Sequence, residues 1–584
     1  MIASAANAVA LNQVHQLLLQ PGFFDEILSS RIYQRRILET NQLWVAWNLN
    51  AAGPEENDAV AIATSMKKLS RRQLLDGSIG IGAFLLTAGA VRAEDPMQKT
   101  MDMSSPMDMS PTMGMVPDKP APAMDQPLVE PEVRRSVNGM LSTTLRVGYA
   151  YRQIGGVRLY VRSYEGGSPG PTLRMKPGDT LRIKLINDLP PNRDWLPADI
   201  SQPHQFNNTN FHFHGSHASP SGIADNVMRS MAPGHTYDIE IKLPEDHTKG
   251  TYWYHPHHHG SADIQMSSGM VGAVVIEGDF ADVPQIASAR ERLLVLTQVV
   301  YDASGMVEDF ETLFPETATR FLAINGQRRP MIEMRPGEVQ RWRILNAAYQ
   351  DDMLLDLEKH DLHAVAYDGI QLGAMQPLKQ VLIAPGQRAD LLVQAGSAGT
   401  YALNAAPYDQ GHPSPVGPLA RVVVSGAPMD MKLPGELPPP PLQTIKESEI
   451  TNRRTVTLSA TAPEADAAGH WQEFGFFIDG KKFNPSRIDQ RVKLGAVEEW
   501  TIVNTHEHDD HVFHIHTNPF QVVSVNGKAL AVPEWRDSVI VERKGGRVVF
   551  RSRFLDFTGV YMVHCHMMNH EEMGMMQTVE VYKS

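Results

Sequence analysis

The chain has 584 residues, enough for about three or four domains of ordinary size, each with its own core. Its 66 acidic residues outnumber its 53 basic ones, and no basic block lies outside the N-terminal region, which argues against a nucleic-acid partner. A single cysteine excludes an internal disulfide.

An export signal is predicted inside the chain rather than at its start. From Met66 the sequence MKKLSRRQLLDGSIGIGAFLLTAGAVRAEDP has a basic start, an apolar run too short to span a bilayer, and a small-residue end at 91–93. Its paired arginines resemble the twin-arginine export signal. We therefore predict a cleaved signal over 66–93, with 1–65 upstream of the true start. The mature protein is expected to be periplasmic or extracellular, with no stable membrane anchor.

A methionine-rich segment follows over residues 94–132, where Met-x-Met pairs alternate with Asp, Ser, Gly and Pro. Such a composition cannot bury a core, so we expect this segment to be disordered. Thioethers select Cu(I) over harder ions. We therefore interpret Met97–Met124 as a segment that binds extra Cu(I), with a plain linker as the alternative.

The rest of the chain predicts an all-β protein with an internal repeat. Short runs rich in Val, Ile, Leu, Tyr and Thr alternate with Gly, Pro, Asn and Asp turns, as in β-sandwiches. The stretches PGDTLRIKLIN, PGEVQRWRILN and LGAVEEWTIVN begin at Pro177, Pro336 and Leu494, which lie 159 and 158 residues apart. We predict three consecutive domains over 133–282, 283–440 and 441–584.

Histidines in His-x-His pairs mark the first and third of these domains. The pairs are His212 and His214, His255 and His257, His514 and His516, and His564 and His566. The middle domain has Asp356, Glu358 and Asn404 at equivalent positions. We therefore expect domain two to hold no metal ligand, and domains one and three to share a metal site.

The stretch HCHMMNHEEMGM suggests two different sites on opposite faces of one strand. Side chains two apart on a strand point the same way, so His564 and His566 face away from Cys565. With His511, His570 and a weak axial Met575, Cys565 completes a His2Cys set typical of blue-copper electron-transfer sites. A structural zinc site is the poorer alternative. On the other face, eight paired histidines could hold three coppers that bind O2.

These motifs resemble those of the multicopper oxidase family, which includes laccases, bilirubin oxidases and bacterial cuprous oxidases. The resemblance extends from about Val133 to the C-terminus. It implies cupredoxin-like Greek-key β-sandwich or barrel domains and four copper ions per chain. The implied ligands are His511, Cys565, His570 and Met575 for a type 1 copper; His212 and His514 for a type 2 copper; and His214, His255 and His566, with His257, His516 and His564, for a type 3 pair.

The resemblance also implies a reaction cycle. A small reductant gives electrons to the type 1 copper, they pass through Cys565 to His564 and His566, and O2 is reduced to water. Glu571 would deliver protons, and Asp225 would be the acidic residue near the type 2 copper. The third motif departs from the family pattern, because Val512 and Thr517 replace the usual proline and glycine.

Cu(I) is the leading candidate for the reductant, in a role in copper resistance. The motivation is the Met-rich segment together with Met567, Met568, Met573 and Met576 near the type 1 motif, although these four could equally be core fillers. The alternatives are a laccase-like oxidase of phenols or aromatic amines, and a non-enzymatic copper-binding protein. We expect a monomer.

Overall fold

The computed structural model describes residues 125–154, 157–192, 196–301, 305, 319–412, 414–461 and 475–583. The predicted export signal, the residues upstream of it and Met97–Met124 lie outside the described residues. Within the described part, no helix has the length and apolar character needed to cross a membrane.

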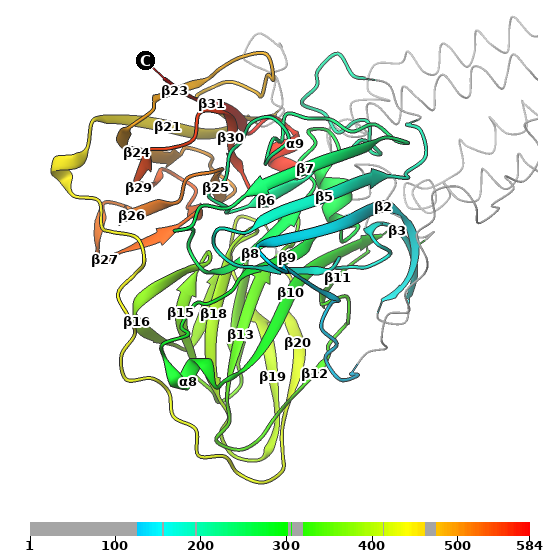
Figure 1. Ribbon diagram of the computed structural model, residues 1–584, viewed down its shortest axis with the longest axis vertical. Helices are drawn as coiled ribbons and strands as arrows, with labels where there is room; N and C mark the ends of the chain where they lie inside the picture. The colour runs from blue at the N-terminus through cyan, green and yellow to red at the C-terminus, as the bar shows by residue number, and fades with distance from the viewer. Residues whose placement is uncertain are drawn as a thin grey trace, which may run out of the picture. The chain divides into compact units, whose positions relative to one another are not determined.

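The described residues form six β-sheets that follow one another along the chain as three pairs (Figure 1). The helical elements in this part of the chain are short: α7 (Ala262–Ser267), α8 (Pro284–Ala287), α9 (Met568–Glu572) and the 3-10 turn η2 (Glu447–Glu449). The prediction of an all-β fold is confirmed.

The first pair joins a four-stranded sheet, β3-β2-β5-β7, to a five-stranded sheet, β1-β4-β9-β8-β6. The strand bounds are β1 (Val133–Arg135), β2 (Met140–Ile154), β3 (Val157–Tyr164), β4 (Thr172–Met175), β5 (Thr180–Asn187), β6 (His212–His214), β7 (Thr236–Lys242), β8 (Gly250–His255) and β9 (Gly272–Ile276). The two His-x-His pairs of this domain therefore begin on β6 and at the end of β8, which are neighbours.

The second pair joins a six-stranded sheet, β11-β10-β13-β18-β15-β16, to a five-stranded sheet, β12-β20-β19-β14-β17. The strand bounds are β10 (Arg290–Tyr301), β11 (Thr319–Ile324), β12 (Met331–Met334), β13 (Val339–Asn346), β14 (Met353–Leu357), β15 (Leu362–Tyr367), β16 (Ile370–Leu378), β17 (Gln380–Ile383), β18 (Arg388–Gln394), β19 (Gly399–Ala406) and β20 (Gly417–Val424). Here β14 and β19 take the places that β6 and β8 have in the first pair.

The third pair joins a six-stranded sheet, β22-β21-β24-β29-β26-β27, to a five-stranded sheet, β23-β31-β30-β25-β28. The strand bounds are β21 (Asn452–Thr461), β22 (Gly475–Ile478), β23 (Gln490–Lys493), β24 (Ala496–Asn504), β25 (His511–Ile515), β26 (Phe520–Val525), β27 (Lys528–Arg536), β28 (Ser538–Val541), β29 (Gly546–Phe554), β30 (Gly559–Cys565) and β31 (Met576–Tyr582). The predicted copper-ligand motifs of this domain lie on or directly after the neighbouring strands β25 and β30.

The repeated asparagine has the same structural role in each domain. Asn187, Asn346 and Asn504 end the equivalent strands β5, β13 and β24, and each is fully buried. Each side-chain amide donates two hydrogen bonds of 2.8–3.0 Å to backbone carbonyls of two separate segments. Because a buried amide must be satisfied, this residue fixes the turn that follows the strand.

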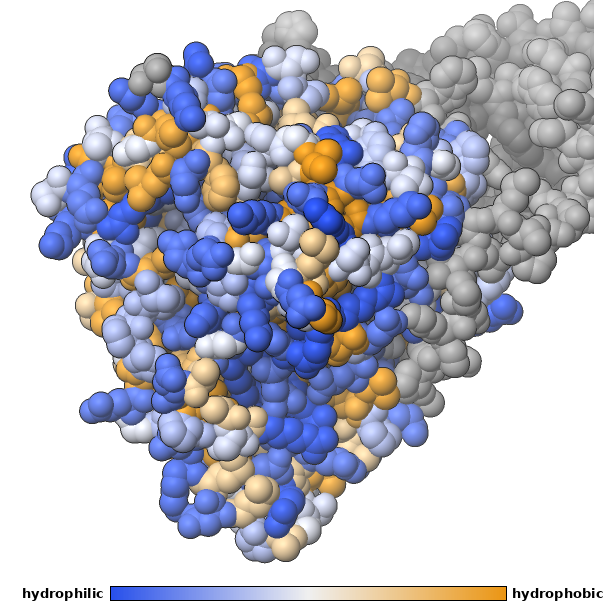
Figure 2. Space-filling model, in the orientation of Figure 1, coloured by the Kyte–Doolittle hydropathy of each residue, from blue (hydrophilic) through white to orange (hydrophobic). Residues whose placement is uncertain are grey.

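Each sheet pair encloses its own hydrophobic core, with Phe213, Trp342 and Trp500 among the large buried side chains of the three domains. A further cluster joins Trp253, Leu345 and Met568, one residue from each predicted domain. Hydrophobic residues at the surface are interspersed among hydrophilic ones on the face in Figure 2.

Candidate metal centre

The strand register brings the His-x-His pairs of domains one and three into equivalent positions. His212 on β6 lies opposite His255 on β8, and His514 on β25 lies opposite His564 on β30. In the middle domain the same position has Asp356 opposite Asn404, and the Asn404 amide donates a 3.0 Å hydrogen bond to the Asp356 carboxylate. At this place the middle domain therefore has a polar pair where the other two have imidazoles.

The residues predicted for a type 1 copper lie together in domain three. The Nδ1 atoms of His511 and His570 are 3.1 Å apart, and Cys565 Sγ lies 3.7 and 3.8 Å from them. A trigonal metal with ligand distances of about 2.0–2.3 Å needs ligand–ligand distances of about 3.5–3.8 Å. The triangle therefore fits such an ion with adjustments of a few tenths of an ångström.

Met575 is held next to this triangle by its backbone. Its N–H donates to the carbonyl of His570 at 2.9 Å, and the N–H of Cys565 donates to its carbonyl at 3.0 Å. Its side chain is fully buried and packs in the same hydrophobic cluster as Cys565. The backbone thus holds Met575 beside Cys565 and His570.

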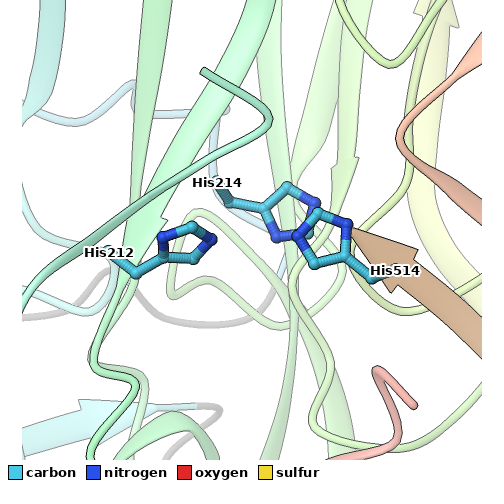
Figure 3. Close-up of side chains that lie close together, drawn as sticks. All are labelled: His212, His214 and His514. Atoms are coloured by element: carbon cyan, nitrogen blue, oxygen red, sulfur yellow. The ribbon is translucent and has the colours of Figure 1, made fainter. Parts of the chain in front are cut away.

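The remaining eight predicted ligands form three groups between domains one and three. The groups are His212, His214 and His514; His214, His255 and His566; and His257, His516 and His564. Figure 3 shows the rings of His212 and His214, from β6, close to that of His514 on β25. The facing nitrogens are 3.1–3.2 Å apart for His257 and His564, His516 and His564, and His566 and His214.

The orientation and protonation of these rings fit metal binding. The Nε2 atoms of His212, His255 and His514 are buried and have no hydrogen-bond partner among the described residues. Burial lowers the pKa of His255 to about 3, which keeps its ring neutral, as metal ligation requires. Burial also raises the pKa of the Cys565 thiol to about 12, so a cation must stand beside it to form the thiolate.

We predict that metal loading stabilises the fold, because it gives partners to these buried nitrogens. An unsatisfied buried polar group costs about 1–3 kcal/mol. The midpoint of thermal unfolding should therefore be several degrees higher for the copper-loaded protein than for the same protein after chelation. Differential scanning calorimetry measures this, and equal midpoints would contradict the prediction.

Glu571 lies behind the histidine groups rather than at the surface. Its fully buried carboxylate is 2.8 Å from Nδ1 of His564 and 3.6 Å from Nδ1 of His257. The carboxylate thus lies beside the His564 nitrogen that does not face the other histidines, and its separation from His257 is too long for a hydrogen bond. Proton delivery by Glu571 remains a prediction.

Asp225 lies against His212, as the sequence predicted for an acidic residue near the type 2 site. Its carboxylate oxygens are 3.1 and 3.2 Å from His212 Nδ1, and one accepts a 2.8 Å hydrogen bond from the backbone N–H of Phe213. Burial raises the pKa of Asp225 to about 8, so this carboxyl group can hold a proton next to His212 near neutral pH.

One further carboxylate at the site was missed in the sequence. Asp537 Oδ1 lies 3.2 Å from Nε2 of His214, and the Asp537 backbone carbonyl lies 2.8 Å from Nδ1 of His514. Arg388 of the middle domain binds Asp537 through both terminal nitrogens and donates to the carbonyl of Thr251 in domain one. No local motif marks these residues, because each partner comes from a different repeat.

The methionines considered as copper donors are mostly buried. Met567, Met568 and Met576 are at most 1% exposed and belong to hydrophobic clusters. Met573 packs against one of these clusters. This favours their interpretation as core fillers. Thr517, in place of the family's glycine, has a φ of 67°, the left-handed conformation that glycine adopts at no steric cost.

Comparisons with known proteins show which family the chain resembles. Three family models described as multicopper oxidase match residues 202–280, 297–424 and 450–584. The chain is 26% identical over 432 residues to a multicopper oxidase of Staphylococcus aureus, covering 72% of this chain and 83% of that protein. It is also 24% identical over 450 residues to the cell division protein FtsP of Escherichia coli, covering 74% and 87%.

A solved structure of similar fold is the multicopper oxidase from Campylobacter jejuni, described as a metallo-oxidase. It aligns with a TM-score of 0.64 at 24% identity, covering 81% of this chain and 97% of that one. The matched family models cover both ligand-bearing domains and the domain between them. The chain therefore belongs to the multicopper oxidase family, and it is a copper-dependent oxidoreductase that uses O2 and a reducing substrate.

Proposed function

We propose that this protein is an exported cuprous oxidase that holds four copper ions and acts in copper tolerance. The assigned ligands are those predicted from the sequence for one type 1, one type 2 and two type 3 ions. The observation that carries the proposal is the position of Cys565 between His564 and His566. One strand end thus contributes to the Cys565 triangle and to two of the histidine groups.

Bound copper would supply one-electron chemistry at the Cys565 triangle and O2 chemistry at the histidine groups. The chain connects the two sites covalently, because one peptide unit separates Cys565 from each neighbouring histidine. Glu571 lies beside His564, and we assign it proton delivery to the histidine groups where O2 would react. Asp225 orients His212 and can hold a second proton.

Support for Cu(I) as the donor comes from the composition of the Met97–Met124 segment. Met567, Met568 and Met576 do not add to this support, because they are buried. A tethered segment that collects Cu(I) raises its local concentration near the enzyme. We predict that removing residues 97–127 raises the KM for Cu(I) roughly tenfold and leaves the KM for a phenol unchanged. Steady-state O2 uptake with each donor measures both values.

A matched control replaces the methionines of that segment by leucine at constant length. If thioethers are what matters, this variant behaves like the deletion; if only a spacer is needed, it behaves like the wild type. Equal Cu(I) kinetics in all three proteins would contradict a catalytic role for the segment. Efficient oxidation of phenols without oxidation of Cu(I) would instead favour the laccase-like alternative.

Export through the signal at 66–93 is part of the proposal and has its own test. N-terminal sequencing of the precursor should begin at Met66, and that of the mature protein near Glu94. Peptides from LNQVHQLLLQPGFF in the precursor would show that residues 1–65 are translated, contrary to the proposal.

A further inference from the structure

The predicted type 1 ligands are almost completely shielded from solvent. Cys565, His511 and Met575 are 0% exposed and His570 is 3% exposed. The Nε2 atom of His511 is buried and has no hydrogen-bond partner in the described part of the chain. A reductant in solution can therefore reach at most the 3% exposed edge of His570, and the side chains that cover the ligands offer a further route for its electron.

Two aromatic rings lie over the type 1 histidines. Phe476 stacks on His570, with ring centroids 4.0 Å apart and planes 19° apart. His506 lies nearly parallel to His511, with centroids 5.3 Å and planes 12° apart. Phe476 meets His506 edge to face, at 6.0 Å and 85°. Of these two covering rings, only His506 has atoms that can bind a metal ion.

His506 connects this covering layer to the surface. Its side chain is 11% exposed, and the exposed His508 has its ring 5.8 Å away at 84°. A carboxylate oxygen of Asp509 is 3.8 Å from Nδ1 of His506, and Glu507 is exposed. These residues belong to the stretch THEHDD, residues 505–510, which lies directly before β25.

The backbone of this stretch is fixed even though the His506 ring is not held by a hydrogen bond. The His506 N–H donates to Asn504 Oδ1 at 2.9 Å, and its carbonyl accepts from the Lys544 N–H at 2.9 Å. The buried Nδ1 of His506 has no hydrogen-bond partner among the described residues. The ring is thus positioned against His511, and its 11% exposed surface is what a ligand from solution can reach.

We propose that His506 and His508 form the docking site for the donor ion Cu(I), and that His506 passes the electron to His511. This rests on the proposed function as a cuprous oxidase. Imidazoles suit copper ions, and the carboxylates of Glu507 and Asp509 attract a cation. Each docked Cu(I) loses one electron and leaves as Cu(II). Four such events, with four protons, reduce one O2 to two waters.

The test compares His508→Gln and His506→Phe with the control His235→Gln, an exposed histidine in the loop before β7 of domain one. In His508→Gln we expect the KM for Cu(I) to rise about tenfold, because a metal ligand is lost. The ratio of kcat/KM for Cu(I) to kcat/KM for a phenol should fall by the same factor. In His506→Phe we expect kcat with Cu(I) to fall as well.

A second readout does not depend on turnover. Ag(I) is a redox-inert substitute for Cu(I), and calorimetric titration of the copper-loaded protein should show one Ag(I) equivalent lost in both variants but kept in the control. Unchanged Ag(I) binding together with an unchanged donor ratio would overturn the docking site. Copper content verifies that His506→Phe still loads its metal, and the exposed His508→Gln decides the question if it does not.

The two proposals fail in distinguishable ways. If the wild type oxidises phenols but not Cu(I), the cuprous oxidase function is wrong, and the Ag(I) titration still decides whether His506 and His508 bind a metal ion. If Cu(I) is oxidised and both variants match the wild type in rate and in Ag(I) binding, only the docking site is wrong.

Discussion

Replacing Cys565 by serine is expected to abolish O2 uptake with every donor and to remove the strong visible absorption of a copper–thiolate centre. A serine hydroxyl is a much weaker and harder ligand than a thiolate, so the His511, His570 and Met575 set loses the ligand that defines it. The exchange is nearly isosteric, and Cys565 is fully buried in a closely packed cluster, so the fold should survive. Oxygen electrode measurements and the visible spectrum check both expectations.

Copper quantitation is the control for this variant. If the electron-entry assignment is right, the copper content falls by about one ion per chain, while the histidine groups between domains one and three keep theirs. Loss of all copper would mean that the sites depend on each other for loading. Retained turnover would overturn the role of Cys565 as the link between the two sites.

Replacing Arg388 by methionine is expected to lower the free energy of unfolding by about 3–5 kcal/mol, since breaking a buried ion pair leaves an uncompensated charge. Arg388 is fully buried and its terminal nitrogens lie 2.9 and 2.5 Å from the oxygens of Asp537. Asp368 is a second carboxylate, 3.7 Å away. Methionine retains much of the apolar part of the Arg388 side chain but supplies no positive charge for the carboxylates of Asp537 and Asp368.

The matched control is Arg182→Met, which removes an exposed arginine paired with Glu240 at 2.7 Å. Exposed pairs contribute about 0–1 kcal/mol, so this variant should unfold close to the wild type in urea. Equal effects of the two substitutions would show that the Arg388 network is not a major source of stability.

The pH dependence of the Arg388→Met variant has a defined sign. Burial raises the pKa of Asp537 to about 6 even with Arg388 present, and removing the cation raises this pKa further. A carboxyl group whose pKa is higher in the folded than in the unfolded state stabilises the fold when protonated and loses that contribution as pH rises through the folded pKa. The stability deficit of the variant should therefore shrink as the pH falls from its own raised Asp537 pKa towards about 6, and should stay constant below that, measured by urea unfolding of the metal-free protein.

The sequence alone determined the all-β class, the repeat and the candidate metal ligands. Strand periodicity places His564 and His566 on one face and Cys565 on the other, and this needs no knowledge of distant residues. The repeated Gly-to-Asn strands were recognisable because a buried asparagine with the same hydrogen bonds is needed at the end of β5, β13 and β24. The alternation of side chains along a strand thus determines which residues can face the same metal site.

Only the tertiary structure decided what surrounds those ligands. Asp537 and Arg388 come from different repeats and meet at His214 through contacts across 149 and 323 residues of sequence, so no spacing rule marks them. The same holds for the cover of the type 1 histidines, where Phe476 comes from β22 and His506 from the loop between β24 and β25. Ligand motifs are local because a strand presents them two residues apart, whereas burial, ring orientation and access depend on how domains one, two and three pack.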